Sequence, residues 1–242
     1  MTIAKAFALL ALVPLMVASC SRKPMIDPIA MDTLPEFNRI VLDVAASYPT
    51  DGTHGYWWPK KSEGSYDGVS EDILLDGVCV MRGEEKGRTY CCGLTLEVFV
   101  KALARHAELH GASAKPYLVA DGFSKFKRLW FVENVNGPGP SAAFEAYGLG
   151  KTIAEEDALP GDFVQIWRRF DPNKAKSPSG HSVIFTGWAR NKTGEIVGME
   201  YFSTQTSTKG ISRNVELWGA PNAKKGMARE NTHWGRVDLA AK

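Results

Sequence analysis

The spacing of apolar residues changes at Leu159-Pro160-Gly161, and this change constrains the fold more than any other feature of the chain. Before it, apolar residues recur at helical spacing. The segments expected to be helical start near Thr33 or span 91–110, 122–130 and 141–147. After it, apolar stretches bounded by turn residues predict strands. The expected strands cover 162–168, 181–190, 195–203 and 211–218. Helices followed by a run of strands indicate an α+β domain with an antiparallel sheet.

The length and charge of the chain limit its size class and its partners. The 242 residues include 44% hydrophobic residues, enough for one full core, and we expect a single domain over 33–242. Lys and Arg number 29 against 27 Asp and Glu, which gives a formal net charge of +2, and no dense basic run is present. Nucleic-acid binding needs a stronger basic footprint, so we expect no nucleic-acid partner.

The N-terminal segment has the pattern of an export signal. Residues 1–19 carry one charge, at Lys5, followed by an apolar run and small residues, as a signal peptide does. The tetrapeptide Val17-Ala18-Ser19-Cys20 resembles a lipobox, which implies cleavage before Cys20 and its lipidation. Residues 20–32 are then a tether, and Ser21 after the cysteine favours the outer membrane. We expect a lipoprotein on the periplasmic face of a membrane, or a secreted protein if Cys20 is not lipidated.

The remaining cysteines, Cys79, Cys91 and Cys92, are odd in number, so in an oxidising compartment at least one thiol is free or pairs outside the fold. A Cys79–Cys92 disulfide leaves Cys91 free, whereas a Cys91–Cys92 disulfide abolishes its reactivity. Cys91 starts an apolar helix, where unpaired N–H groups favour the thiolate. To make the thiolate the main form at pH 7, it must be stabilised relative to the thiol by roughly 2.7 kcal/mol, of which the helix start supplies ~1 kcal/mol. A nearby imidazolium must supply the rest.

His181 is the candidate partner because it begins an apolar strand after a loop that contains Gly and Pro. The turn 191–194 joins this strand to the next as a hairpin, and its register places His181 opposite Thr204 or Gln205. We favour Gln205 as the residue that orients the imidazole, because its amide oxygen can accept the ring N–H. Ser203 and Thr204 remain alternatives.

Three motifs in this order resemble a known family. They are Cys91-x-Gly93-Leu94 at a helix start, Pro160-Gly-Asp-Phe163 entering a strand, and Gly180-His-Ser-Val-Ile-Phe185 on the next strand. The chain resembles the NlpC-type and CHAP-type cell-wall cysteine peptidases and amidases of the papain-like superfamily. The resemblance implies a helix carrying the nucleophile Cys91, packed on an antiparallel sheet carrying the base His181.

The same resemblance implies an amide-cleaving thiol hydrolase that acts on peptidoglycan without a cofactor. Two departures are visible: Tyr90 stands where the family often has Asp, and 90 positions separate Cys91 from His181, a long interval. The excess fits the two short helices predicted between them, which would cover the cleft. A noncatalytic envelope lipoprotein that binds a glycan or a protein, and an acyl transferase, are the alternatives.

Aromatic residues are the candidates for substrate contact. We expect Trp57, Trp58 and Tyr90 to line the substrate site, and Tyr66 or Tyr90 to join the Cys91 backbone N–H in the oxyanion hole. His106 and His110 have the i, i+4 spacing of a zinc pair, but the glutamate between them does not adjoin the first histidine as the metalloprotease motif requires. No metal is therefore expected.

Overall fold

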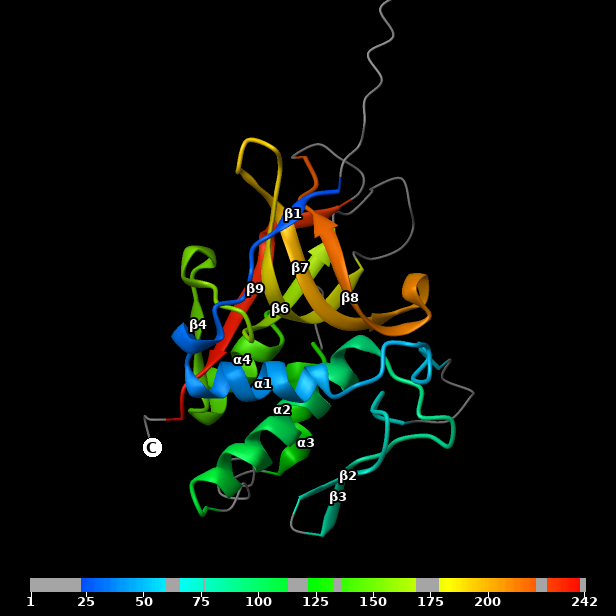
Figure 1. The fold of residues 1–242 in the computed structure, drawn as a ribbon. Helices are drawn as coiled ribbons and strands as arrows, with labels where there is room; N and C mark the ends of the chain where they lie inside the picture. The colour runs from blue at the N-terminus through cyan, green and yellow to red at the C-terminus, as the bar shows by residue number, and fades with distance from the viewer. Residues whose placement is uncertain are drawn as a thin grey trace, which may run out of the picture.

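The computed structural model describes residues 23–59, 66–75, 77–112, 122–132, 136–168, 179–220 and 226–239. Within these ranges, a seven-stranded antiparallel sheet and four α-helices make up the main body, with the helices gathered below the sheet in the view of Figure 1. The prediction of an α+β protein with an antiparallel sheet is confirmed. The predicted signal peptide 1–19 and the lipidation site Cys20 lie outside the described residues.

The helices largely follow the sequence prediction. They are α1 (Glu36–Ala46), α2 (Cys91–Leu109), α3 (Phe123–Trp130) and α4 (Pro140–Tyr147). Helix α1 begins later than the expected start near Thr33, because residues Met31–Thr33 form a separate 3₁₀ turn in which the Thr33 hydroxyl donates to the Ala30 carbonyl. Pro35 then precedes the first helical residue.

The sheet has the strand order β4-β9-β5-β6-β7-β8, with β1 added against β6. The strands are β1 (Met25–Ile26), β4 (Gly150–Ile153), β5 (Phe163–Arg168), β6 (Gly180–Arg190), β7 (Ile196–Gln205), β8 (Gly210–Leu217) and β9 (Met227–Val237). Strands β5 to β8 match the predicted ones. Sequence analysis missed β4 and β9, because exposed Arg229 and Glu230 interrupt the apolar alternation of β9.

Part of the expected tether 20–32 belongs to the sheet instead. Met25 pairs with Arg190 and Ile26 with Ala189, and the Asp27 carboxylate accepts from the Arg190 guanidinium at 2.9 Å. The reason lies in strand lengths: β6 continues to Arg190, but its pairing with β5 ends at Ile184. The last residues of β6 would leave an open edge, and β1 covers part of it.

The sheet is buried on both faces. Phe163, Ile184 and Phe202 point into a core shared with the helices. Alternate residues such as Val183 and Phe185 point into a second, smaller core on the other face. The two cores hold the middle strands rigidly, so the residues at their ends have fixed positions.

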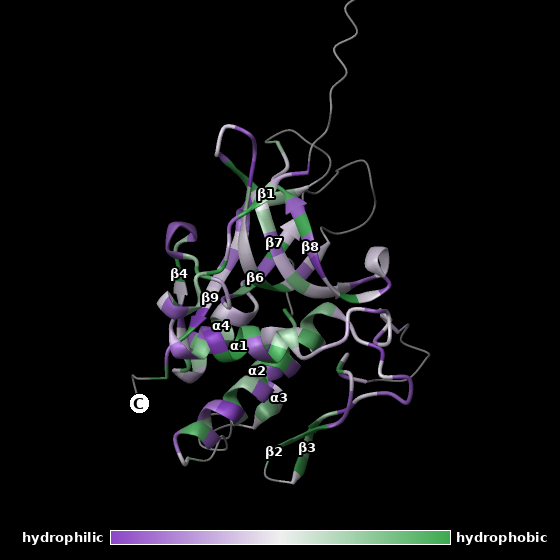
Figure 2. Cartoon of the chain, in the orientation of Figure 1, coloured by the Kyte–Doolittle hydropathy of each residue, from purple (hydrophilic) through white to green (hydrophobic). Residues whose placement is uncertain are grey.

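A separate hairpin, β2 (Ile73–Leu75) and β3 (Val78–Met81), lies apart from the main sheet (Figure 1). It is coloured as apolar in Figure 2, and Leu74 and Val78 are exposed there. Among the residues that the structure describes, no helix combines the length and the apolar character needed to cross a bilayer.

Candidate active site

Cys91 is the first residue of helix α2. The residue before it, Tyr90, is the N-cap but makes no side-chain capping bond, so the amide groups of the first turn are not satisfied by a cap. Gly93 explains the glycine of the Cys-x-Gly motif, because a Cβ at this position would overlap the carbonyl oxygens of Asp67 and Gly68. Only glycine lets segment 66–68 cross so close to the start of the helix.

Hydrogen bonds on both sides of Cys91 tie the helix to the sheet. Before it, the Thr89 hydroxyl donates to Thr204 Oγ1 on β7 at 3.0 Å. After it, Thr95 Oγ1 and Ser182 Oγ on β6 lie 2.8 Å apart, and the Trp130 indole N–H donates to Thr95 at 3.1 Å. All of these groups are buried. They fix the helix start against strand residues that lie 87 and 115 positions from their partners in the sequence.

Cys91 and His181 line the same cleft, which has a volume of about 560 Å³. Its walls also include Tyr56, Trp58, Arg168 and Gln205. Cys91 is 9% exposed and His181 5% exposed, so both are shielded from bulk water except through the cleft. The start of helix α2 and the start of strand β6 therefore lie at the same cleft, as the sequence predicted.

The surroundings of Cys91 favour its thiolate. Its pKa lies well below the usual value, first because of a hydrogen bond from the Cys92 thiol, and then because of the charge and hydrogen bonding of His181 and the Ser182 amide. These effects exceed the opposing effect of burial. The pKa of Cys92 is raised instead, by the same contact and by burial. Of the two adjacent sulfurs, Cys91 is therefore the one that carries the negative charge.

One ring nitrogen of the His181 imidazole makes no hydrogen bond to the described residues. Nε2 is buried and has no hydrogen-bond partner among the described residues. Nδ1 is therefore the candidate for the nitrogen that acts on the Cys91 sulfur. The ring packs edge-on against Tyr201, with centroids 5.6 Å apart. Nε2 is the atom that a third residue would have to orient.

The three candidates for that third residue have different partners in the structure. The Ser203 hydroxyl donates to the Ser182 carbonyl, and Thr204 accepts from Thr89. Gln205 alone of the three lines the cleft with His181, but its Oε1 accepts from the Tyr201 hydroxyl at 3.2 Å. Gln205 as the orienting residue thus stays a prediction. It requires Oε1 to turn from Tyr201 to the imidazole.

The register between β6 and β7 agrees with one of the two predicted alternatives. Ile184 pairs with Phe202, and continuing the same register places His181 opposite Gln205. Two irregularities in this pair of strands, near Thr186 and Arg190, shift the register and then restore it. The predicted turn is present, and Gly194 has a φ of +84°.

The three aromatic residues expected at the substrate site have different surroundings. Trp58 lines the cleft and is 59% exposed. The Trp57 ring stacks on Tyr66 at 5.1 Å, with the Arg88 guanidinium 3.9 Å from the ring centroid. Tyr90 is buried beside Trp58 and Tyr66. Substrate contact by these residues stays a prediction, and of the three it is Trp58 whose ring is free to make it.

The expected oxyanion donors are also engaged elsewhere. The Tyr66 hydroxyl donates to the Trp57 carbonyl, and the Tyr90 hydroxyl donates to the Tyr66 carbonyl. Tyr56 lines the cleft instead. Burial raises the pKa of the Tyr56 hydroxyl to about 12, and the negative charge of the nearby Cys91 sulfur adds to this effect. The sequence did not place Tyr56 beside Cys91, because the bridge between Tyr56 and Thr89 is what brings it there.

Arg168 on the cleft wall belongs to a polar network. Its guanidinium makes two hydrogen bonds of 2.6 Å to the Glu216 carboxylate. The Tyr201 hydroxyl lies 3.0 Å from Glu216 and 3.2 Å from Gln205 Oε1. The network therefore connects Arg168 to Gln205 through two side chains, and it gives the cleft polar lining residues in addition to the exposed Trp58.

Cys79, Cys91 and Cys92 are all free thiols in the structure. Neither of the disulfides considered from the sequence is formed. Cys79 is exposed on the β2–β3 hairpin, whereas Cys92 is buried in the core under the helices. The two are therefore in different environments, and Cys91 keeps the free sulfur that nucleophilic chemistry needs.

We expect iodoacetamide at about pH 6 to modify Cys91 before Cys79, although Cys79 is the more exposed thiol. The thiolate is the reacting form, and a lowered pKa keeps it populated at acidic pH. Its reaction should slow only as the pH falls through the lowered pKa. Peptide mapping by mass spectrometry measures both sites. If Cys91 and Cys79 were alkylated at equal rates, and if the rate at Cys91 were unchanged in His181→Ala, the imidazole would not activate Cys91.

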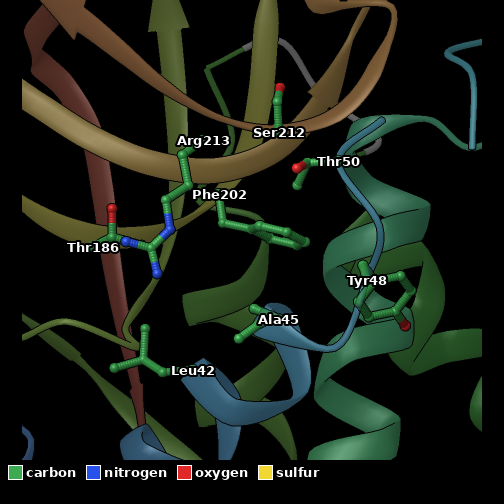
Figure 3. Close-up of a pocket in the computed structure, with 9 residues that line it drawn as sticks. Leu42, Ala45, Tyr48, Thr50, Thr186, Phe202, Ser212 and Arg213 are labelled. Carbon is green, nitrogen blue, oxygen red and sulfur yellow. The ribbon is translucent and has the colours of Figure 1, made fainter. Parts of the chain in front are cut away.

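A second cavity, of about 480 Å³, contains no cysteine or histidine among its lining residues. In Figure 3 the Arg213 side chain extends toward Thr186 and Leu42. Arg213 lies 3.6 Å from the Glu200 carboxylate, which also accepts from Thr186. Glu200, far along β7 from His181, thus contacts two residues that line this cavity.

Comparison of the chain with models of protein families, with curated proteins and with solved structures finds no match.

Proposed function

We propose that this protein is a papain-like cysteine hydrolase that cleaves an amide bond of peptidoglycan, as an endopeptidase or an amidase. The observation that carries the proposal is the pairing of Cys91 and His181 in one cleft, with the Cys91 pKa well below its usual value. A lowered thiol pKa beside an imidazole is the arrangement that activates a cysteine nucleophile. Together with the sequence motifs, it supports a papain-like form of the α+β fold.

The chemistry follows from the positions of these groups. The Cys91 thiolate attacks the amide carbonyl, and His181 gives its proton to the leaving amine. Water then attacks the thioester while His181 takes up a proton, which frees the acid and restores the thiolate. In this proposal the Cys91 backbone N–H, at the start of the helix, stabilises the oxyanion. Tyr56 is the candidate for the second donor, because its side chain lines the cleft near the sulfur.

The cleft offers two kinds of contact to a cell-wall substrate. The exposed ring of Trp58 can stack on a sugar or on an apolar part of a stem peptide. Arg168 and Gln205, which also line the cleft, provide polar groups for a peptide. The lipobox-like start of the sequence supports a location in the cell envelope as a lipoprotein, where peptidoglycan is accessible. No cofactor is part of this proposal.

Mass spectrometry of muropeptides before and after incubation with the purified protein tests the proposal. We expect new amine and carboxyl termini that identify the cleaved bond, and none with His181→Ala, which removes the acid and base. An added amine acceptor distinguishes hydrolysis from acyl transfer. Unchanged muropeptides that are nevertheless retained by the protein would favour the noncatalytic binding lipoprotein instead.

A further inference from the structure

Three metal-binding side chains converge where the start of helix α1 meets the end of helix α2. Glu36 is the first residue of α1, His106 lies in the last turn of α2, and His110 caps that helix. Their ligand atoms all lie within 4.8 Å of one another. We propose that Glu36, His106 and His110 bind a divalent transition-metal ion, and that Zn²⁺ is the natural occupant.

The distances between the donor atoms fit a tetrahedral ion. Zn²⁺ has bonds of about 2.0–2.1 Å to nitrogen and oxygen, which places neighbouring ligand atoms about 3.3 Å apart in a tetrahedron. Glu36 Oε2 lies 3.6 Å from His106 Nε2 and 3.0 Å from His110 Nε2. These two separations lie on either side of the ideal one and need shifts of a few tenths of an ångström to reach it, and the ligand atoms of His106 and His110 lie within 4.8 Å of each other.

The donor types select the class of metal. Two imidazole nitrogens and one carboxylate oxygen suit Zn²⁺, Ni²⁺ and Cu²⁺, whereas Mg²⁺ and Ca²⁺ require mostly oxygen ligands. Three protein ligands leave a fourth position for water. Both histidines must be neutral to bind.

The affinity should be moderate. Nδ1 of His106 is buried without a hydrogen-bond partner among the described residues, so no second contact fixes the orientation of this ring. Loss of such a contact typically costs 10- to 100-fold in affinity. Glu36 and His110 are about half exposed. We therefore expect dissociation constants on the order of micromolar for Zn²⁺.

The position of this cluster gives the metal a structural role. His106 follows Cys91 by 15 residues on the same helix, which corresponds to about 22 Å at 1.5 Å per residue. The metal therefore cannot touch the atoms that react in the proposed hydrolysis. It would join the first residue of α1 to the last turn of α2. Sequence spacing could not show this, because the third ligand lies 70 positions before His106.

Binding of Zn²⁺ to the untagged full chain tests the proposal, with Glu36→Gln and His110→Ala as the test variants. Both positions are exposed, so the fold should persist. The control is Glu108→Gln, which removes an exposed carboxylate from the same turn of α2 but is not part of the cluster. Because the cysteines also bind Zn²⁺, the measured quantity is the difference in stoichiometry between each variant and the wild type.

We expect the wild type and Glu108→Gln to bind one more Zn²⁺ at micromolar concentration than His110→Ala does. Glu36→Gln should bind this ion at least about 10-fold more weakly, since it loses a direct ligand. The same ion should raise the melting temperature of the wild type and the control only, because it binds the folded state. Equal stoichiometry and equal thermal shifts in all four proteins would overturn the proposal.

Discussion

Cys91→Ala should lower the rate of amide cleavage by about 10⁴-fold or more, because it removes the attacking sulfur. Its fold should be unchanged, since alanine keeps the helix start and loses only one buried sulfur atom. The rate of release of new termini from purified peptidoglycan is the measurement. Circular dichroism and thermal unfolding verify that the variant is folded.

The adjacent cysteine provides the matched control. Cys92→Ala should keep the reaction but move the acidic limb of the pH–rate profile to higher pH, because the Cys92 thiol is the largest of the effects that lower the Cys91 pKa. With that donor removed, the thiolate population is lost at a higher pH. Cys79→Ala, which changes an exposed hairpin residue, should alter neither the reaction rate nor its pH profile. Full activity in Cys91→Ala with loss in Cys92→Ala would reassign the nucleophile.

Arg236→Met should reduce the free energy of unfolding by about 3–5 kcal/mol, because it leaves a buried carboxylate without its cation. Asp162 has no exposed side-chain surface and accepts from Arg236 at 2.9 and 2.7 Å. Burial raises the pKa of Asp162 even with Arg236 in place. Urea denaturation measures the loss.

Two further variants separate the cost of the unpaired charge from the general effect of substitution. Asp162→Asn together with Arg236→Met should recover much of the lost stability, because no buried charge then remains. Arg229→Met removes the cation of a comparable pair with Glu155, but Arg229 is 56% exposed, so a change within about 1 kcal/mol is expected. A loss in Arg236→Met no larger than in Arg229→Met would contradict the prediction.

The ion pair of Asp162 with Arg236 explains why the Pro-Gly-Asp-Phe motif contains an aspartate. Asp162 also accepts from the Asn38 side chain at 2.8 Å and from the Leu159 amide at 2.7 Å. It therefore joins helix α1, strand β9 and the loop before β5. A Cβ at Gly161 would overlap Asn38, and the φ of +94° at Gly161 also requires glycine. The motif positions the strand before β6, which carries His181.

Local patterns were sufficient to predict α2 and strands β5 to β8, since their apolar periodicity is regular and their ends carry Gly or Pro. They were insufficient for β9, whose exposed charges hide the strand pattern and whose pairing is with β4 and β5. Long-range pairing also determines whether residues 25–26 form strand β1, because β1 pairs with the part of β6 that β5 leaves open.

For the site, the sequence indicated Cys91 and His181 because each stands at a recognisable helix or strand start. Tyr56 was not placed beside Cys91 and Arg168 was not identified, since their places in the cleft depend on the pairing of residue 56 with 89 and on the network through Glu216. An aromatic run gives no indication of which rings are packed against neighbours, as Trp57 is, and which line a cavity, as Trp58 does.

The pairing of β1 with the far end of β6 has a consequence for reach. If Cys20 carries a lipid, Met25 follows it by five positions, a span of at most about 18 Å when fully extended. From Ala189, opposite Ile26, β6 runs back to His181 over eight positions, or about 26 Å. Together the two spans would limit how far the cleft can lie from the bilayer, and a longer segment before Met25 would let it reach farther into the cell wall.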